Sequence, residues 1–388
     1  MTLLTLKPKS HNRVRNGHLW IFRDELAPHE PLQAGTLIRL HTDYGYDLGV
    51  GVYHPTSQIA VRLLRWQNES LDGFFEQRIT EALQLRARLF PAEPTYRLVF
   101  GESDFLPGLI IDRYGDYFAM QLLSAGMDVR KNEIINAIRT VFPNTKGIIA
   151  KNDSQLRVKE GLRTEEEVVY GEIPDEITVT ENGITLSISL THGQKTGYFL
   201  DQRRNRAMVA ELSNGLSVLD CFTNQGGFAL NAAKGGASRA VGVDISASAI
   251  ERCKRNAELN GFENCEWLKD DVFDYLKQQA QQEAKWDMVI LDPPAFTKSK
   301  ANIPQAKRGY AEINRQALKL ITNGGFLVSS SCSHHIAEPM FLEIIEAEAK
   351  RINRKLKLIQ RGMQSPCHPI YVPMPETQYL KFFVFEVR

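Results

Sequence analysis

The sequence predicts an α/β protein whose C-terminal half is a parallel β-sheet covered by helices on both faces. Three observations predict this fold. Strand-like and helical runs alternate from about residue 208, a turn containing glycines joins the first strand to its helix, and an acidic residue ends several strands. The remaining sequence is typical of two smaller domains, so we expect domains at residues 1–68, 72–178 and 179–388.

The alternating half begins after a predicted hairpin, in which Asn182-Gly183 joins two strand-like runs. Alternation at this spacing is typical of parallel strands connected by crossover helices. The expected elements are Ser217–Asp220, Gly227–Ala233, Ala240–Asp244, Ser246–Asn260, Cys265–Lys269, Val272–Gln279, Met288–Asp292, Tyr310–Ile321, Gly325–Ser330, Met340–Ala349 and Leu380–Val387.

Residues 1–68 predict a small all-β unit, because short β-prone runs are separated by Gly, Pro and Asp turns. Residues 1–66 hold eight Lys and Arg against five Asp and Glu, although the whole chain has a net charge of only +1. Basic residues alternate with aromatic ones, a mixture that grips phosphates and stacks on bases. Alternatively, the aromatic residues are core and the arginines are solvated. The residues are Arg13, Arg15, His18, Trp20, Phe22 and Arg23.

The central region, residues 72–178, mixes both types of element and predicts a small α+β domain. We expect helices at Phe74–Phe90 and Asp128–Val141. The expected strands are Leu109–Asp112, Tyr117–Leu123 and Gly147–Lys151.

The five cysteines are odd in number, and their spacing fits neither a disulfide framework nor a zinc site. We therefore expect no metal and a reducing, cytoplasmic location. No apolar run approaches the ~20 residues that span a bilayer, so we expect no membrane association.

A ligand site is predicted where Asp220 ends the first strand and the segment Cys221-Phe222-Thr223-Asn224-Gln225-Gly226-Gly227-Phe228 leads into a helix. Doubly wound sheets hold their ligands at such a turn, and glycines let a ligand approach the backbone. The segment matches neither the dinucleotide fingerprint nor the P-loop, which disfavours both a dinucleotide and ATP.

Three later strand ends also carry acidic residues. Asp244 lies 24 residues after Asp220, where a carboxylate accepts hydrogen bonds from ribose hydroxyls. Asp271 is placed to meet an adenine amino group, and Asp292 begins the rigid loop Asp292-Pro293-Pro294-Ala295-Phe296. In this order the features resemble the class I S-adenosylmethionine-dependent methyltransferases, a resemblance that also assigns Ile245, Val272 and Pro293 to the cofactor site.

Further segments make the resemblance closer, and it covers essentially the whole chain. They are GQKTGYFLDQR at residues 193–203, GESDFLPGLIIDR at 101–113 and SSCSHH at 330–335. With them the chain resembles the bacterial 23S ribosomal RNA cytosine-C5 methyltransferases of the RlmI type. The resemblance implies an N-terminal PUA domain that binds RNA, and S-adenosyl-L-homocysteine as the second product. It implies that residues 179–207 form a hairpin and a loop enclosing the cofactor, with Lys195, Tyr198 and Phe199 as contacts.

The same resemblance places the catalytic nucleophile at Cys332. A thiolate that adds to carbon 6 of cytosine makes carbon 5 nucleophilic, and thiolates both attack and leave readily near neutral pH. A buried structural thiol is the alternative. Two-cysteine enzymes of this chemistry carry a second cysteine where this chain has Pro293-Pro294, so Asp292, a histidine or water has to remove the C5 proton.

The expected substrate is therefore 23S ribosomal RNA. Pro294, Phe296 and the arginines Arg13, Arg15 and Arg23 are its predicted contacts. Lys298, Lys300, Lys307 and Arg308 form a basic run that either holds RNA phosphates or is solvated. Two other functions stay open: methylation of a base nitrogen, such as guanine N7, and a non-catalytic role in RNA binding or ribosome assembly. A homodimer also stays open.

Overall fold

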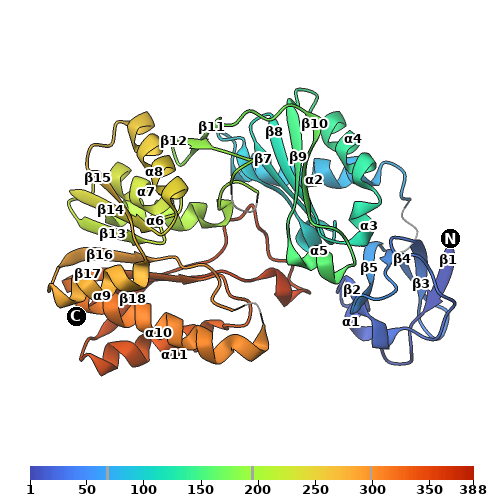
Figure 1. The fold of residues 1–388 in the computed structure, drawn as a ribbon. Helices are drawn as coiled ribbons and strands as arrows, with labels where there is room; N and C mark the ends of the chain where they lie inside the picture. The colour runs from blue at the N-terminus through green and yellow to red at the C-terminus, as the bar shows by residue number, and fades with distance from the viewer. Residues whose placement is uncertain (67–69, 194–195, 298) are drawn as a thin grey trace. The chain divides into compact units, whose positions relative to one another are not determined.

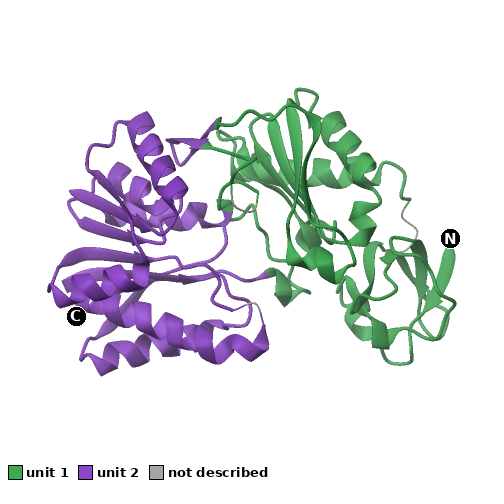
Figure 2. Ribbon diagram, in the orientation of Figure 1, with its two compact units in different colours: residues 1–177, 188–200, 366–377 green, residues 178–187, 201–365, 378–388 purple. Residues whose placement is uncertain are grey.

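The computed structural model describes residues 1–66, 70–193, 196–297 and 299–388. The chain forms two compact units (Figure 2). Unit 1 comprises Met1–Ile177, Ile188–Leu200 and Pro366–Thr377. Unit 2 comprises Thr178–Ser187, Asp201–Ser365 and Gln378–Arg388. Each unit has its own sheets and its own hydrophobic cores.

The N-terminal part of unit 1 is a five-stranded sheet in the order β1-β3-β4-β5-β2 (Figure 1). Its core holds the apolar side chains of these strands, including Ile38, Leu40 and Val61. This part is built mainly of short strands, as the sequence predicts. The elements are β1 (Thr2–Thr5), α1 (Asn12–Arg15), β2 (Trp20–Phe22), η1 (Arg23–Glu25), β3 (Leu37–His41), β4 (Asp47–Tyr53) and β5 (Ile59–Arg65).

The central part of unit 1 is a second five-stranded sheet, in the order β10-β9-β8-β7-β6. Only β8 and β9 pair in parallel. Apolar side chains of α2 and α4 complete its core. The elements are α2 (Phe74–Leu89), β6 (Thr95–Phe100), η2 (Gly101–Asp104), β7 (Leu109–Tyr114), β8 (Tyr117–Leu122), α3 (Ala125–Asp128), α4 (Lys131–Val141), β9 (Gly147–Asn152), α5 (Gln155–Lys159) and β10 (Glu165–Gly171).

The prediction of one helix from Asp128 to Val141 was wrong at its start. Asp128 is the last residue of α3, and a separate helix, α4, begins at Lys131. Arg130 leaves the helical backbone conformation, with φ −105° and ψ 16°. Its guanidinium donates to the carbonyls of Gly126 (2.9 Å) and Gly35 (3.1 Å). The bond to Gly35 joins the break to the N-terminal part of unit 1, and no local sequence pattern predicts it.

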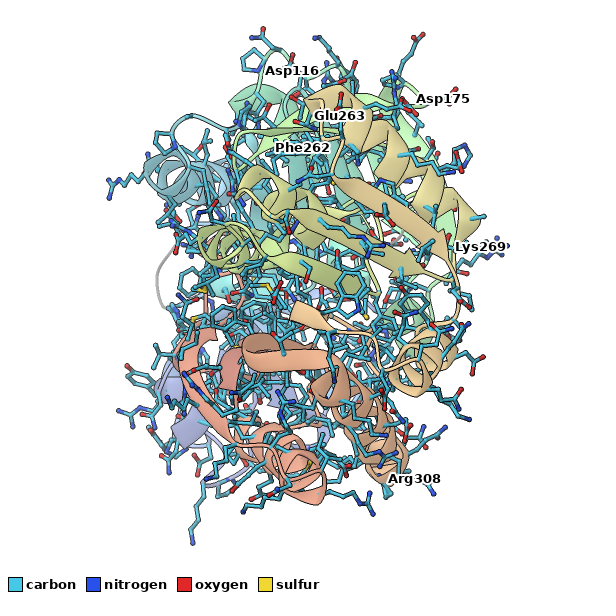
Figure 3. All side chains as sticks on the ribbon, turned by 90° about the vertical axis from the view of Figure 1, so that its left-hand side faces the viewer. Asp116, Asp175, Phe262, Glu263, Lys269 and Arg308 are labelled. Carbon is cyan, nitrogen blue, oxygen red and sulfur yellow. The ribbon has the colours of Figure 1, made fainter. Side chains whose placement is uncertain are left out.

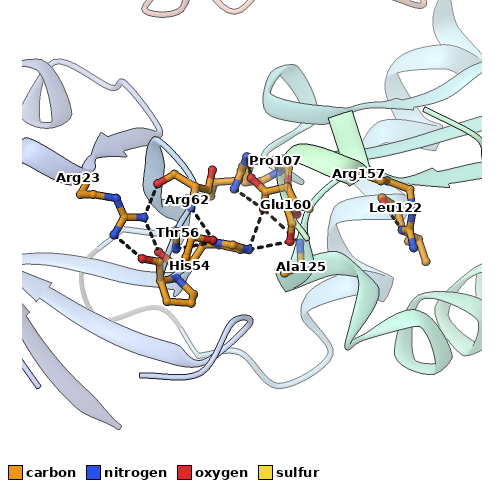
Figure 4. A network of polar contacts seen from close by, with 12 residues as sticks. Arg23, His54, Thr56, Arg62, Pro107, Leu122, Ala125, Arg157 and Glu160 are labelled. Carbon is orange, nitrogen blue, oxygen red and sulfur yellow. Dashed lines mark hydrogen bonds and ion pairs between the residues drawn. The ribbon is translucent and has the colours of Figure 1, made fainter. Parts of the chain in front are cut away.

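A buried polar network at Glu160 joins the two parts of unit 1 (Figure 4). Arg62 on β5 donates to both carboxylate oxygens of Glu160, at 2.9 and 3.2 Å. The His54 ring bonds the Glu160 carbonyl at 2.9 Å. Burial alone would raise the pKa of Glu160, but the charge of Arg62 and several hydrogen bonds lower it below its ordinary value.

Unit 2 is built on a seven-stranded sheet in the order β15-β14-β13-β16-β17-β19-β18. The first five strands are parallel, as predicted, whereas β19 runs antiparallel to both β17 and β18. Helices α6, α7 and α8 lie on one face and α9, α10 and α11 on the other (Figure 1).

The elements of unit 2 follow the predicted order, with β18 and the helix α6 as additions. The largest difference in bounds is at α10, which begins at Ile303 and not at Tyr310. The elements are η3 (Leu200–Gln202), α6 (Arg203–Leu212), β13 (Ser217–Cys221), α7 (Gly227–Lys234), β14 (Arg239–Asp244), α8 (Ala247–Asn260), β15 (Cys265–Lys269), α9 (Val272–Gln281), β16 (Trp286–Leu291), η4 (Lys300–Asn302), α10 (Ile303–Leu320), β17 (Ile321–Ser331), α11 (Glu338–Arg351), β18 (Leu356–Gly362), η5 (Pro375–Thr377, in unit 1) and β19 (Lys381–Val387).

The predicted hairpin forms from β11 (Ile177–Glu181) and β12 (Ile184–Ile188). Asn182 and Gly183 both have positive φ, 53° and 67°, as a tight two-residue hairpin turn requires. In the described ranges, no helix is long and apolar enough to cross a membrane.

Candidate active site

The site lies at the carboxyl edge of the parallel strands of unit 2. Cys221, the last residue of β13, has Val243 of β14 and Leu291 of β16 as its Cα partners. The next residues on those strands are Asp244 and Asp292, so the register places both carboxylates at the edge where doubly wound sheets bind ligands. The strands that alternate with helices along the sequence therefore place these acidic residues at one edge of one sheet.

The turn between β13 and α7 is shaped by three residues with positive φ: Phe222 (63°), Asn224 (51°) and Gly226 (82°). A Cβ on Gly226 would lie 2.9 Å from the Trp267 ring, so this position requires glycine. α7 begins at the next residue, and the backbone N–H groups of its first turn have no partner within the helix. The turn thus presents backbone donors that a ligand carboxylate can use.

Asp220 is fully buried beneath this turn. Its Oδ2 accepts hydrogen bonds from Thr223 Oγ1 (2.5 Å) and from the Ala229 backbone N–H (3.0 Å). Among the described residues, Oδ1 has no hydrogen-bond partner. Burial raises the pKa of Asp220 to about 7. Asp220 therefore stabilises the turn through Oδ2. Its Oδ1 can still accept a hydrogen bond from the amine of a bound cofactor.

Asp244 is half-buried at the edge, and each of its oxygens accepts one backbone hydrogen bond. Oδ2 accepts from Asn224 N (3.0 Å) and Oδ1 from Ser246 N (2.9 Å). A carboxylate has about four acceptor positions, so two remain for ribose hydroxyls. The neighbouring Ile245 side chain is 65% exposed, an apolar surface against which an adenine ring can pack.

Asp271 is the N-cap of α9, where its Oδ1 accepts from the Phe273 N–H (2.8 Å) and the Asp274 N–H (3.3 Å). This second role was not predicted, and it leaves Oδ2 for an adenine amino group. Val272 is buried in the main core of unit 2. Cofactor contact by Asp271 and Val272 stays a prediction.

Asp292 follows β16 and is held by two side chains that the sequence reasoning missed. Gln202 Nε2 donates to Asp292 Oδ1 at 2.8 Å, and the Ser330 hydroxyl donates to the same oxygen. Burial raises the pKa of Asp292 to about 6, in spite of these hydrogen bonds. The only sequence signal for Gln202 was its place in the GQKTGYFLDQR segment.

Cys332 directly follows β17 and is half-buried. Tyr310 of α10 holds the residues on either side of it: Ser331 Oγ donates to the Tyr310 hydroxyl (2.9 Å), which also shares a hydrogen bond with Ser333 Oγ (3.1 Å). From β19, Lys381 Nζ donates to the Ser333 carbonyl (2.7 Å). Neither Tyr310 nor Lys381 was identified from the sequence.

Burial raises the pKa of three of the other cysteines. Cys221 is fully buried in the main core of unit 2, and burial raises its pKa well above the ordinary value. Burial likewise raises the pKa of Cys253 and of Cys265, the latter to about 12. No disulfide links the cysteines, all of which lie in described ranges. Among the described residues, no group of His, Cys, Asp and Glu is arranged to hold a metal.

The proline loop after β16 continues into an aromatic row. Pro293 is buried and Pro294 is exposed. Phe296 packs against Tyr310, with ring centroids 4.7 Å apart, and against Phe273 at 5.9 Å. Phe222 in turn contacts Phe273 edge-on at 6.3 Å. Phe296 thus has a packing role, and its stacking on a base stays a prediction.

The remaining predicted contacts stay predictions. Tyr198 and Phe199 belong to unit 1, where the Tyr198 N–H donates to the Tyr114 hydroxyl (3.1 Å). Lys195 and Lys298 lie outside the described residues. Arg308 extends from α10 into solvent (Figure 3), which suits either alternative for the basic run.

The N-terminal arginines differ from one another. Arg13 donates to Glu25 Oε2 (2.7 Å), and Arg23 donates to backbone carbonyls that include Ser57 O (2.6 Å). Arg15 is exposed and bonds the Tyr44 hydroxyl (3.2 Å). It also lies over the exposed Tyr46 ring, 5.4 Å from its centroid. Of these arginines, Arg15 with its two tyrosines best fits a surface that binds nucleic acid.

This fold and this edge of the sheet define the class of protein, an S-adenosylmethionine-dependent methyltransferase. The family of that description matches residues 106–383, and a PUA-like domain family matches residues 4–66. Two solved structures share the whole fold at 24% identity, and each comparison covers 100% of both chains. One is a candidate S-adenosylmethionine-dependent methyltransferase from Streptococcus mutans (TM-score 0.84), and the other a candidate methyltransferase complexed with S-adenosylhomocysteine (TM-score 0.87).

Curated relatives give the family. The ribosomal RNA large subunit methyltransferase I of Pseudoalteromonas atlantica is 37% identical and covers 99% of both chains. The protein of that name from Klebsiella pneumoniae is 38% identical, over 99% of this chain and 98% of its own. The chain therefore belongs to the family of the ribosomal RNA large subunit methyltransferase I proteins.

Proposed function

We propose that this protein methylates carbon 5 of a cytosine in 23S ribosomal RNA, with Cys332 as the nucleophile. The observation that carries the proposal is the placement of Cys332 at the end of β17, beside the strand that carries Asp292; Leu291 and Ser329 are Cα partners. The name of the relatives and the PUA-like N-terminal domain support RNA of the large subunit as the substrate.

In this proposal the Cys332 thiolate forms a bond to carbon 6 of the cytosine. The electron pair moves to carbon 5, which then takes the methyl group that S-adenosylmethionine would supply when bound, with cleavage of the donor's S–CH3 bond and release of S-adenosylhomocysteine. Loss of the C5 proton and cleavage of the C6–sulfur bond restore the ring and the thiolate. Cys332 suits this role better than Cys221, Cys253 and Cys265, whose raised pKa values keep them as thiols.

Asp292 is our candidate for removal of the C5 proton. Its pKa of about 6 leaves it mostly ionised at neutral pH and close enough to neutrality to take up a proton. Gln202 and Ser330 both bond Oδ1, so they orient the carboxylate. Asp292 thereby replaces the second cysteine that two-cysteine enzymes use.

Arg15, Tyr44 and Tyr46 are the side chains that we assign to RNA contact on the N-terminal domain. Tyr44 and Tyr46 are both exposed, and Arg15 contacts each of them. A guanidinium can bind phosphate while the rings stack on unpaired bases, at about 1–3 kcal/mol per base.

The test is methylation of 23S ribosomal RNA from a strain that lacks the gene, with radiolabelled S-adenosylmethionine and identification of the modified nucleoside. We expect 5-methylcytidine with the wild-type protein and none with Cys332→Ala, because the substitution removes the attacking sulfur. Calorimetry should show unchanged S-adenosylmethionine affinity for Cys332→Ala.

Full activity of Cys332→Ala contradicts the nucleophile. A product such as 7-methylguanosine would instead support transfer to a base nitrogen, and absence of both cofactor binding and turnover would support the non-catalytic function. Sedimentation velocity on the same preparation tests the homodimer.

A further inference from the structure

Lys381 is a buried lysine at the first position of β19, with 8% of its surface exposed. Its Cα partner is Ser331, the residue before Cys332. Its Nζ donates to the Ser333 carbonyl (2.7 Å), on the other side of Cys332, and to the Tyr379 carbonyl (2.7 Å). The ammonium group is therefore fixed beside the segment that carries the proposed nucleophile.

The ammonium bonds to carbonyls and not to a carboxylate. In the described part of the chain, no Asp or Glu forms a salt bridge with Lys381, and the nearby Glu338 is paired with Arg361 (3.0 Å). Burying a lysine without an anion is costly, which makes Lys381 a candidate for interaction with an anion that forms during function.

We infer that the Lys381 ammonium stabilises the thiolate of Cys332, which makes Lys381 a positioning residue for the nucleophile. The inference rests on the proposed function for the use of that thiolate, although the thiolate itself can be measured separately. A positive charge near a thiol favours its ionised form, as in other reactive cysteines.

Electrostatics agree with the geometry. Burial lowers the pKa of Lys381 to about 8, and the negative charges of Cys332 and Glu338 oppose this shift. Lys381 thus keeps its proton at neutral pH, and the sulfur and the nitrogen are electrostatically coupled.

The other groups around them contribute less positive charge. The pKa of His334 is lowered by burial, by Lys381 and by His335, so His334 is mostly neutral near pH 7. Burial raises the pKa of Tyr310, which stays protonated, and the carboxylate of Asp292 disfavours a nearby thiolate. We therefore assign the stabilisation of the Cys332 thiolate to Lys381.

The experiment measures the alkylation rate of Cys332 by iodoacetamide as a function of pH, by peptide mass spectrometry on the intact protein. For the wild type we expect a midpoint below the ~8.5 of a free cysteine. Lys381→Met should move the midpoint upward by about one pH unit. The thiolate fraction near pH 7 then falls about tenfold, and alkylation slows by the same factor. Lys381→Arg keeps the positive charge, so its alkylation rate should stay within about threefold of the wild-type rate.

Lys357→Met is the matched control, because Lys357 lies on the adjacent β18, is solvent-exposed and pairs with Glu386. Its alkylation profile should equal that of the wild type. A wild-type midpoint at or above that of a free cysteine overturns the inference, even if Lys381→Met does not fold. An unchanged profile in folded Lys381→Met also overturns it. If instead Cys332→Ala retains methylation, the proposed function fails, while the alkylation profile still decides the role of Lys381.

Discussion

At the scale of single residues, the position of Cys332 depends on hydroxyl groups that hold the backbone on either side of it. Ser331 and Ser333 both share hydrogen bonds with the Tyr310 hydroxyl, and Tyr310 itself is fully buried. Its ring packs edge-on against Phe341, with ring centroids 5.1 Å apart, and this packing holds the hydroxyl group in place. The position of the sulfur is therefore set from α10, and not only by its own strand.

Tyr310→Phe should reduce kcat by about tenfold and leave KM for RNA nearly unchanged. The substitution removes only the hydroxyl, so the ring packing remains while two serines lose a partner, at about 1 kcal/mol of stability for each hydrogen bond. Steady-state methylation and urea unfolding provide the two measurements.

Tyr275→Phe on α9 is the control, since Tyr275 is also buried and, in the described part of the chain, the hydrogen bonds of the two serines with a tyrosine hydroxyl are those with Tyr310. Equal loss of kcat in both variants would mean that Tyr310 acts through general stability alone.

At the scale of elements, the turn between β13 and α7 is the part of the fold that we expect to hold the cofactor. The turn holds three residues of positive φ within five positions, Phe222 to Gly226. Asp220 braces it from below and Asp244 receives the Asn224 N–H. The contact with Asp244 depends on the adjacent parallel strands β13 and β14 being in register.

Gly226→Ala should weaken S-adenosylmethionine binding by at least about tenfold, measured by calorimetry. The new Cβ meets the Trp267 ring at 2.9 Å while the backbone has φ 82°, so the turn has to shift. A left-handed residue with a side chain costs about 1–2 kcal/mol even without a clash.

Gly261→Ala isolates that backbone cost, because Gly261 has φ 65° and a Cβ there meets nothing within 4 Å. This variant should lose stability and keep its cofactor affinity. Wild-type affinity in Gly226→Ala would show that the turn does not enclose the cofactor.

For the molecule as a whole, unit 1 depends on a charged contact between its N-terminal and central parts. Arg62 comes from the N-terminal sheet, and Glu160 follows α5 of the central part. Both side chains are buried, so each needs the other to offset its lost hydration. The RNA-binding surface that we assign to the N-terminal domain is anchored in this way to the central domain.

Glu160→Gln should cost about 3–5 kcal/mol of unfolding free energy near neutral pH, because Arg62 is left buried without its anion. The folded-state pKa of Glu160 is below its ordinary 4.5, so the contribution is complete above that value. It is lost as the pH falls through the folded-state pKa, and the difference between the two proteins should then shrink.

Urea unfolding at neutral and at acidic pH measures this difference. Glu81→Gln removes an exposed partner of Arg78 and should cost less than about 1 kcal/mol. A similar cost for both variants, or a difference that does not vary with pH, would contradict the role of the network.

The sequence by itself determined the features that depend on local pattern. Period and turn chemistry predicted the strands β13, β14 and β16 and placed Asp220, Asp244 and Asp292 at their ends. The cofactor class followed from that order along the chain. Cys332 was found in the same way, by resemblance of its motif.

Only the tertiary structure decided what surrounds these groups. Gln202 reaches Asp292 across 90 residues, and Lys381 reaches Ser333 across 48, because α6 packs on the sheet and β19 pairs antiparallel with β17. The raised pKa of Asp292 and the lowered pKa of Lys381 likewise come mainly from burial. Burial and pairing depend on chain segments far apart in sequence, so no local pattern contains them.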